Sequence, residues 1–342
     1  MGTSINASLR APCFGRPKLQ TDLEPPAVIA SEARRSIVEK SGFMDCHTTF
    51  AMTNKWLLTL AAACALVVSG TAHALQLTDD RGITVTFAQT PQRIVSLLPS
   101  LTESVCALEQ CQRLVGVDRY SNYPTSVRRL PVVGGGLDPN IESIVALKPD
   151  VVLLATSSRA GLRLESLGIK VVALEPKSHA DVRRVLKKLG VLLDVPDEIG
   201  AERLWRVIDT SVSAAAQSLP AKAKNIRVYF EVNRGPYAAA ESSFIGETLA
   251  RLGVKNVVPA TLGPFPLLNP EFVVRANPDV IMIGNRSMQA MVPYPGWSSI
   301  KAVREQRICV FTPEEADVLV RPGPRMAEAA RIMAKCLENN IR

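Results

Sequence analysis

The chain has 342 residues, 47% of them hydrophobic, and this length and composition predict a globular protein of two domains. The formal net charge is +8, but the basic residues are scattered rather than gathered in a stripe, which argues against nucleic-acid binding. His179 is the one histidine beyond residue 74, too few for a histidine-rich metal site or a Ser/His/Asp triad. Its polar neighbours, Lys-Ser-His-Ala-Asp, predict a solvated loop residue.

The N-terminal region has the features of an export signal. Residues 52–74 have a polar start with Lys55, an apolar run from Trp56 to Val68 and a small-x-small end at Ala72-His73-Ala74, a pattern typical of a secretory signal peptide. Residues 1–51 lack periodicity and hydrophobic density, so we expect a disordered or mis-assigned extension. An ordinary buried helix, or a lipoprotein processed at Cys64, is the alternative. These patterns predict a periplasmic protein that begins at residue 75.

Four of the seven cysteines lie in the predicted mature part. An even number in an exported chain favours two disulfides, for which three connectivities are possible. We expect the pairs Cys106 with Cys111 and Cys309 with Cys336. Free buried thiols are the alternative.

Short strand patterns alternate with helical patterns along the mature chain, an order typical of a parallel α/β lobe. The first series predicts strands at 93–98, 115–117, 151–155 and 171–174, with helices at 102–108, 141–147 and 162–167. The second predicts strands at 227–232, 256–258, 280–283 and 308–311, with helices at 244–252, 271–276 and 324–337. The same order therefore occurs twice.

The repeat is visible in the residues themselves. Segment 140–155 aligns without gaps on segment 269–284, and six of the sixteen pairs are identical, where unrelated segments share roughly one. Each copy has an Asn that suits a helix N-cap, a Glu in the first turn, a Pro-Asp stop and a buried strand. The chain therefore consists of two related lobes.

A helical pattern over residues 197–219 separates the lobes and predicts one continuous, rigid connecting helix. We assign residues 75–195 to the N-terminal lobe, 196–220 to the connecting helix and 221–342 to the C-terminal lobe. The predicted fold class is α/β, with two related Rossmann-like lobes of parallel sheet joined by one long rigid helix.

The motifs of common enzymes are missing from the sequence. Neither a Gly-x-Ser-x-Gly elbow nor a Walker loop is present, and Gly134-Gly135-Gly136 lacks the Lys-Ser/Thr that a phosphate site requires, so we interpret it as a flexible turn. Glu314-Glu315 is interpreted as an exposed acidic loop. We expect no enzymatic activity, no metal and no cofactor.

Four aromatic residues follow strand ends, where open α/β sheets bind ligands. They are Tyr120 and Tyr123 in the first lobe, and Tyr237 and Phe265 in the second. Aromatic faces offer a large contact area at low entropic cost, which suits a large, flat, partly apolar ligand. We interpret the four as ligand-binding residues.

Three segments resemble those of the periplasmic binding proteins for iron-siderophores, haem and vitamin B12. They are Arg-Ile-Val-Ser-Leu-Leu-Pro-Ser-Leu-Thr-Glu at 93–103, Val-Gly-Val-Asp-Arg-Tyr-Ser-Asn-Tyr-Pro at 115–124 and Ile-Val-Ala-Leu-Lys-Pro-Asp at 144–150. Within this family the chain is most similar to cobalamin-binding receptors. The resemblance implies two lobes joined by a rigid helix, the architecture of class III periplasmic binding proteins. It also implies that cobalamin or another corrinoid is carried as a transported ligand in the cleft.

The resemblance also implies roles for single residues. Tyr120, Tyr237 and Phe265 correspond to aromatic residues that contact the ligand, and Glu142 and Glu271 to glutamates that dock on arginines of the permease. The implied partner is an inner-membrane ABC permease with its ATPase, and we expect a monomer that binds no nucleic acid.

A haem or ferric-siderophore receptor is the alternative within the family. Anionic siderophore complexes favour arginines, and Arg234, Arg286 and Arg321 lie in predicted loops where they suit this role.

Overall fold

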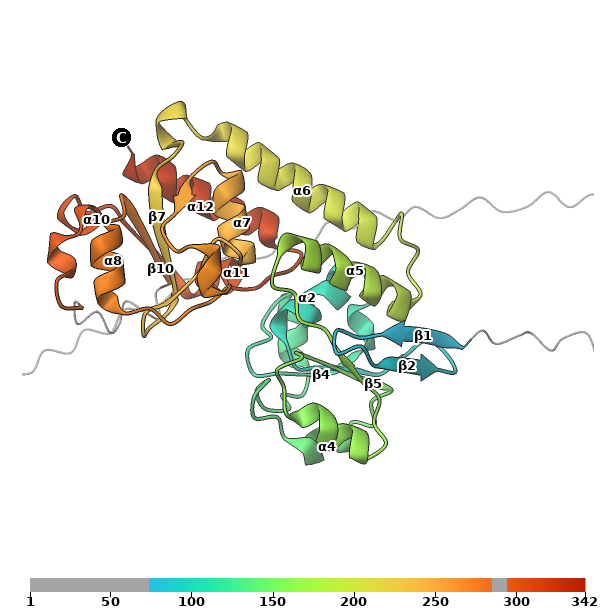
Figure 1. Cartoon of the computed structure of the whole chain (residues 1–342). Coiled ribbons are helices and arrows are strands. Elements are labelled where there is room, and N and C mark those ends of the chain that lie inside the picture. The colour runs from blue at the N-terminus through green and yellow to red at the C-terminus, as the bar shows by residue number, and fades with distance from the viewer. Residues whose placement is uncertain (1–73, 285–293, 342) are drawn as a thin grey trace, which may run out of the picture. The chain divides into compact units, whose positions relative to one another are not determined.

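The computed structural model describes residues 74–284 and 294–341. The predicted extension 1–51, the predicted signal peptide apart from Ala74, and Arg286 lie outside these ranges. The described residues form two α/β lobes, which precede and follow helix α6 (Ala201–Ser218) in the chain (Figure 1). Within the described ranges, no helix combines the length and apolar content that crossing a bilayer requires.

The N-terminal lobe is a parallel sheet with flanking helices, preceded by a β-hairpin. Its elements are β1 (Leu75–Thr78), β2 (Thr84–Phe87), β3 (Ile94–Ser96), α2 (Pro99–Ala107), η1 (Cys111–Arg113), β4 (Leu114–Val117), η2 (Thr125–Arg129), α3 (Ile141–Ala146), β5 (Val151–Leu154), α4 (Ala160–Ser166), β6 (Val171–Ala173) and α5 (His179–Leu193). The sheet order is β4-β3-β5-β6, all parallel. Every residue of β5 is buried, as expected for a strand covered on both faces.

The C-terminal lobe repeats this plan. Its elements are η3 (Ala221–Ala223), β7 (Arg227–Asn233), β8 (Tyr237–Ala238), α7 (Phe244–Arg251), β9 (Lys255–Asn256), η4 (Ala260–Leu262), α8 (Pro270–Ala276), β10 (Val280–Gly284), η5 (Trp297–Ser299), α10 (Lys301–Arg304), β11 (Ile308–Phe311), α11 (Pro313–Leu319) and α12 (Met326–Asn340). The parallel strands have the order β9-β7-β10-β11, and β8 pairs antiparallel with β7. In both lobes the first of the parallel strands, β3 or β7, therefore lies between the second and the third.

The repeated residues have the same structural roles in both lobes. The Asn140 side chain accepts a backbone hydrogen bond in the first turn of α3 at 2.8 Å, and Asn269 does so in α8 at 2.9 Å. Asp150 accepts the backbone N–H of Arg93, just before β3, at 2.8 Å. Asp279 accepts that of Arg227, the first residue of β7, at 3.0 Å. The repeat in the sequence is thus a repeated helix–turn–strand unit.

The connecting helix is shorter than predicted. It begins at Ala201 rather than at residue 197, because residues 197–200 form a separate turn in which the Gly200 N–H bonds to the Pro196 carbonyl at 2.9 Å. Gly200 has a ψ of −107°, which no helical residue adopts. The 18-residue helix is about 27 Å long and packs on α5, α7 and α12, so it contacts both lobes (Figure 1).

The acidic pair at 314–315 is helical rather than part of a loop. Both glutamates lie in the first turn of α11, where Thr312 is the N-cap. The Thr312 hydroxyl accepts the N–H of Glu315 at 3.2 Å, and the Glu315 carboxylate accepts that of Thr312 at 3.0 Å. This reciprocal capping box begins the helix.

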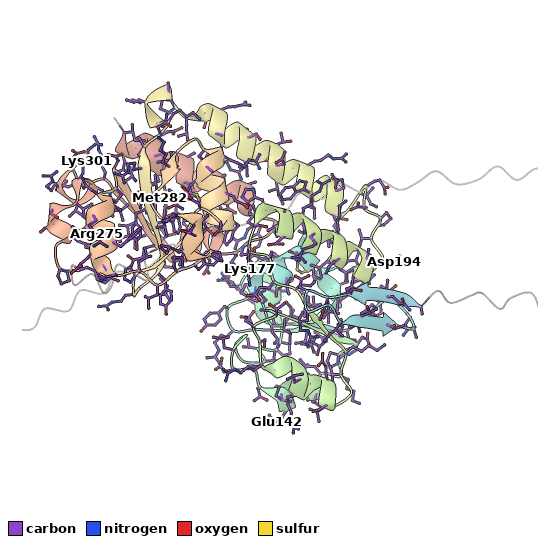
Figure 2. The ribbon with its side chains drawn as sticks, viewed as in Figure 1. Glu142, Lys177, Asp194, Arg275, Met282 and Lys301 are labelled. Atoms are coloured by element: carbon purple, nitrogen blue, oxygen red, sulfur yellow. A yellow bond between two sulfur atoms is a disulfide. The ribbon has the colours of Figure 1, made fainter. Side chains whose placement is uncertain are left out.

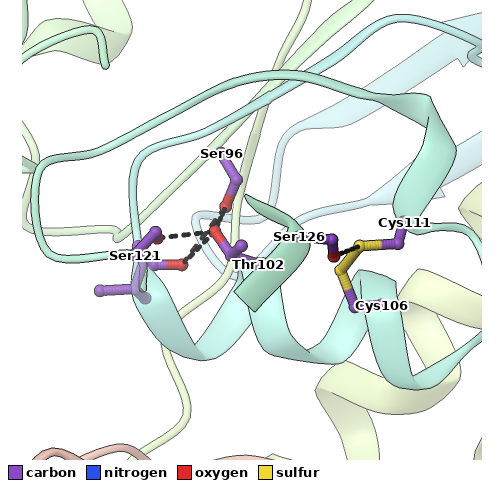
Figure 3. Close-up of a disulfide and its surroundings, with 7 residues drawn as sticks. Ser96, Thr102, Cys106, Cys111, Ser121 and Ser126 are labelled. Carbon is purple, nitrogen blue, oxygen red and sulfur yellow. Dashed lines mark hydrogen bonds between the residues drawn. A yellow bond between two sulfur atoms is a disulfide. The ribbon is translucent and has the colours of Figure 1, made fainter. Parts of the chain in front are cut away.

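Two disulfides join four cysteines in the pairs expected from the sequence. Cys106 at the end of α2 is bonded to Cys111 in η1 (Figure 3), and Cys309 in β11 is bonded to Cys336 in α12. The second bond connects the edge strand of the C-terminal sheet to the last helix, so each lobe contains one disulfide.

Candidate ligand-binding cleft

A cavity of about 390 Å³ lies between the two lobes. Its N-terminal wall is built from the loops after β3, β4, β5 and β6, which contribute Leu98, Tyr120, Ser157 and Glu175 among others. The C-terminal lobe contributes Phe244, Phe265, Val320 and Pro322. The cavity is therefore at the carboxyl ends of the strands, where open α/β sheets bind ligands, and its volume is in the usual range for small-molecule sites.

Two of the predicted ligand-binding aromatics face this cavity from opposite lobes. Tyr120 is 50% exposed in the N-terminal wall, and Phe265 is 37% exposed in the C-terminal wall. Phe265 also packs on Phe244, with ring centroids 5.9 Å apart. These rings offer a ligand apolar surface on two sides.

The other predicted contacts lie outside the cavity lining. The Tyr123 ring is covered by the guanidinium of Arg325, 4.2 Å from the ring centroid. Tyr237 lies in β8 and forms an isolated bridge with Leu267. Arg234 is exposed in the turn between β7 and β8. The structure thus brings Tyr120 and Phe265 together at the cavity and leaves Tyr123, Tyr237 and Arg234 beyond it.

Arg321 is committed to protein contacts instead of being open to an anionic ligand. Its side chain is 7% exposed and forms ion pairs with Glu103 at 2.9 Å and Asp317 at 2.8 Å. It also donates to the side chain of Asn122 at 2.8 Å and to the backbone carbonyl of Tyr120 at 2.9 Å. Arg321 therefore links the C-terminal lobe to the loop that carries Tyr120.

Glu103 is the centre of this network, which sequence reasoning missed. Its carboxylate is 2% exposed and accepts hydrogen bonds from Arg321 and also from Nε and Nη2 of Arg325, at 2.9 and 2.7 Å. We call Glu103, Asp317, Arg321 and Arg325 the interlobe ion cluster. Glu103 is the one charged residue of the apolar helix α2, a signal that could have indicated a buried ion pair.

Three hydroxyl groups, those of Ser96, Thr102 and Ser121, lie close together where the Tyr120 loop meets α2 (Figure 3). The Thr102 hydroxyl lies 2.9 Å from the hydroxyls of both Ser96 and Ser121, and Ser121 donates to the carboxylate of Asp118. Asp118 also accepts the backbone N–H of Tyr120 at 3.0 Å. Burial raises the pKa of the Asp118 carboxyl group. These hydrogen bonds thus hold the backbone of the Tyr120 loop.

His179 is buried between the lobes, so its prediction as a solvated loop residue was wrong. Its ring Nε2 lies 2.9 Å from the Thr248 hydroxyl and 3.1 Å from the Phe244 carbonyl, and its backbone N–H donates to Glu247 at 2.6 Å. Burial, and next the charge of Arg251, lower the pKa of the imidazole to about 4. A neutral His179 therefore joins the start of α5 to α7.

Gly136 of the glycine run lines the cavity, and the run is held by hydrogen bonds, unlike the flexible turn predicted. The carbonyl of Gly134 accepts the N–H of Arg119 at 2.7 Å, and that of Gly136 accepts the Ser158 hydroxyl at 3.0 Å. A Cβ atom at position 136 would lie 2.7 Å from the carbonyl oxygen of Leu97. Glycine is needed here because the wall passes so close to β3.

The two glutamates of the repeat are exposed in the first turns of their helices. Glu142 lies in α3 at the surface of the N-terminal lobe (Figure 2), and Glu271 occupies the matching position in α8. Neither forms a salt bridge with another residue of the ranges 74–284 and 294–341. Within those ranges, no group of three or more His, Cys, Asp or Glu is arranged to hold a metal ion.

Comparison with known proteins identifies the family. The model of the periplasmic binding protein family matches residues 94–315. An uncharacterized ABC transporter substrate-binding lipoprotein of Bacillus subtilis is 30% identical over 268 residues, which are 74% of this chain and 82% of that protein. A vitamin B12-binding protein of Pectobacterium atrosepticum is 27% identical over 247 residues, 70% of this chain and 86% of that one.

A solved structure of a periplasmic haem-binding protein from Pseudomonas aeruginosa has the same fold. It superposes with a TM-score of 0.61 at 26% identity, covering 74% of this chain and 94% of that one. The chain therefore belongs to the periplasmic binding protein family, the substrate-binding components of ABC importers, which bind a solute and deliver it to a membrane permease without transforming it.

Proposed function

We propose that the protein binds cobalamin or a related corrinoid in the cleft between its lobes. The observation that carries this proposal is the placement of Tyr120 and Phe265 on opposite walls of one cavity. A broad macrocycle with an apolar face gains contact area from both rings, whereas a small polar solute does not. The vitamin B12-binding relatives support the same ligand class.

The test is a calorimetric titration of the exported protein with cyanocobalamin, with haem and a ferric hydroxamate in parallel. We expect a dissociation constant for cyanocobalamin at or below roughly 1 μM, about −8 kcal/mol. The double variant Tyr120→Ala, Phe265→Ala should lose this binding. Leu162→Ala is the matched control, because it removes an exposed apolar side chain of α4 away from the cavity. Heat from haem or the hydroxamate alone would contradict the corrinoid assignment.

Haem or a ferric siderophore is the second candidate, and Lys177 is the observation that favours it. This exposed residue lines the cavity, and its ammonium group suits the carboxylates of haem or an anionic iron chelate. The solved haem-binding relative shares the fold. The parallel titrations distinguish this candidate from the first.

We further propose that Glu142 and Glu271 dock on basic residues of the permease. Their support is their equivalent, exposed positions on the two lobes, which offer the partner one negative charge from each side. Such charges mainly set orientation and encounter rate. The double variant Glu142→Gln, Glu271→Gln should bind ligand normally but lower cellular uptake, whereas Glu198→Gln, an exposed control, should not. Undiminished uptake would contradict the docking role.

A further inference from the structure

We propose that Glu175 makes the cleft selective for the charge of its ligand. Its carboxylate accepts hydrogen bonds from N–H donors, such as the primary amides at the edge of a corrinoid, and repels ligands that carry a carboxylate at the same place. This inference rests on the proposed corrinoid function. It assigns a specificity-determining residue to the N-terminal wall of the cavity.

Glu175 lies at the carboxyl edge of the N-terminal sheet, directly after β6, and lines the cavity. One of its oxygens accepts the hydroxyl of Thr156, while the other has only a long contact of 3.5 Å from Ser157. Its backbone N–H donates to Asp80 at 3.0 Å, which fixes the main chain. A carboxylate has about four lone-pair sites, so Glu175 keeps acceptor capacity toward the cavity.

The other two carboxylates of the lining are already engaged. Asp118 is 1% exposed and accepts the Ser121 hydroxyl together with a backbone N–H. Asp138 is paired with Arg119 at 2.6 Å, and its side chain is 68% exposed toward solvent. Among the lining residues that the structure describes, Glu175 is therefore the carboxylate best placed to meet a ligand donor.

The charge balance of the lining points the same way. Three carboxylates and one amine, that of Lys177, line the cavity, and only one of the carboxylates, Asp138, is neutralised by an arginine outside the lining, Arg119. Lys177 is exposed near the junction of the lobes, where its backbone carbonyl accepts the N–H of Phe244 at 2.8 Å (Figure 2). A negative wall inside a cleft with apolar surroundings disfavours an anion more than open solvent does.

Converting one amide of the ligand to a carboxylate measures this effect directly. Like charges a few ångströms apart at the intermediate polarity of a cleft weaken binding by roughly ten-fold or more. The probes are cyanocobalamin and its three monocarboxylic acids, in each of which one peripheral propionamide is hydrolysed. We expect the exported protein to bind at least one acid roughly ten-fold more weakly than the parent at pH 7.5.

Glu175→Gln keeps the shape and one acceptor oxygen but removes the charge. We expect it to bind cyanocobalamin roughly three- to ten-fold more weakly, because an amide oxygen accepts a hydrogen bond less strongly than a carboxylate does. It should also abolish the discrimination against that acid, because a neutral acceptor does not repel it. Glu198→Gln, exposed and outside the cavity, should retain the full discrimination.

The outcomes separate the two proposals. Equal binding of parent and acids by the unaltered protein, or discrimination that persists in Glu175→Gln, would overturn the role of Glu175 while the corrinoid function stands. Binding of haem, a dianion, with no binding of cyanocobalamin would overturn both.

Discussion

Replacing Glu103 with glutamine removes the carboxylate on which the two arginines of the interlobe ion cluster converge. Its side chain is 2% exposed, and those of Arg321 and Arg325 are 7% and 13% exposed. Removing one partner of a buried ion pair costs about 3 to 5 kcal/mol, because the remaining charge stays buried without compensation. Arg321 retains Asp317, so we expect a loss near the lower limit, about 3 kcal/mol, in the free energy of unfolding.

Urea unfolding followed by circular dichroism at pH 7 measures this loss. The matched control is Glu109→Gln, which breaks a surface pair with Arg203 whose N–O distance is 3.4 Å and whose side chains are 82% and 49% exposed. Such a pair contributes about 1 kcal/mol or less. If Glu103→Gln loses no more stability than this control, the reasoning that the cluster holds the lobes together is refuted.

Three further predictions concern acid, disulfides and ligand-induced closure. The pKa of His179 is about 4 in the folded protein and about 6.5 in the unfolded chain. Its contribution to stability is therefore complete above pH 6.5 and falls on acidification towards pH 4, by up to about 3 kcal/mol. His179→Gln should reduce the shift of the urea midpoint between pH 7 and 4, and an unchanged shift would contradict this. A disulfide that closes a longer loop restricts the unfolded chain more and therefore stabilises the fold more. Replacing Cys309 and Cys336, which are 27 residues apart, by serine should lower the free energy of unfolding in urea by about 3 to 4 kcal/mol. The same change at Cys106 and Cys111, which are 5 residues apart, should lower it by about 2 kcal/mol, and a reversed order would count against this argument. Small-angle scattering should show little change of the radius of gyration on ligand addition, since the interlobe ion cluster, His179 and α6 all join the lobes. A large compaction would disprove this.

The parts of the fold that follow local patterns could be predicted from the sequence. The apolar run at β5 gives a strand whose every residue is buried, and the repeat predicts two lobes that share one strand order. Tyr120 and Phe265 could be placed at the cleft because the carboxyl ends of parallel strands define one edge of a sheet. Each of these inferences depends only on residues that are close to one another in the sequence.

Local patterns are least informative where distant segments decide the environment of a residue. Arg321 is buried against Glu103, and one face of the Tyr123 ring lies against Arg325. Such contacts join residues more than 200 positions apart, which no local pattern contains. The sequence shows the charges, whereas the fold alone shows which of them are paired.

His179 illustrates a signal that was present but was interpreted wrongly. The polar residues around it are the N-cap of α5, in which Ser178 and Asp181 form a capping box. Ser followed three residues later by an acidic residue marks the start of a helix as well as it marks a loop. The burial of the ring then depends on Phe244 and Thr248 of α7, which become its neighbours only in the folded chain.

The contacts between the lobes bear on where ligand selectivity arises. The interlobe ion cluster joins α2 and the Tyr120 loop to the C-terminal lobe, His179 joins α5 to α7, and α6 packs on elements of both lobes. A cleft connected in these ways is largely preformed, so binding costs little ordering of the protein. The free energy of closing the two lobes around a ligand then differs little between one ligand and another. Differences in affinity must instead come from the side chains of the wall, and Glu175, which retains acceptor capacity there, is in a position to decide between ligands of similar shape and different charge.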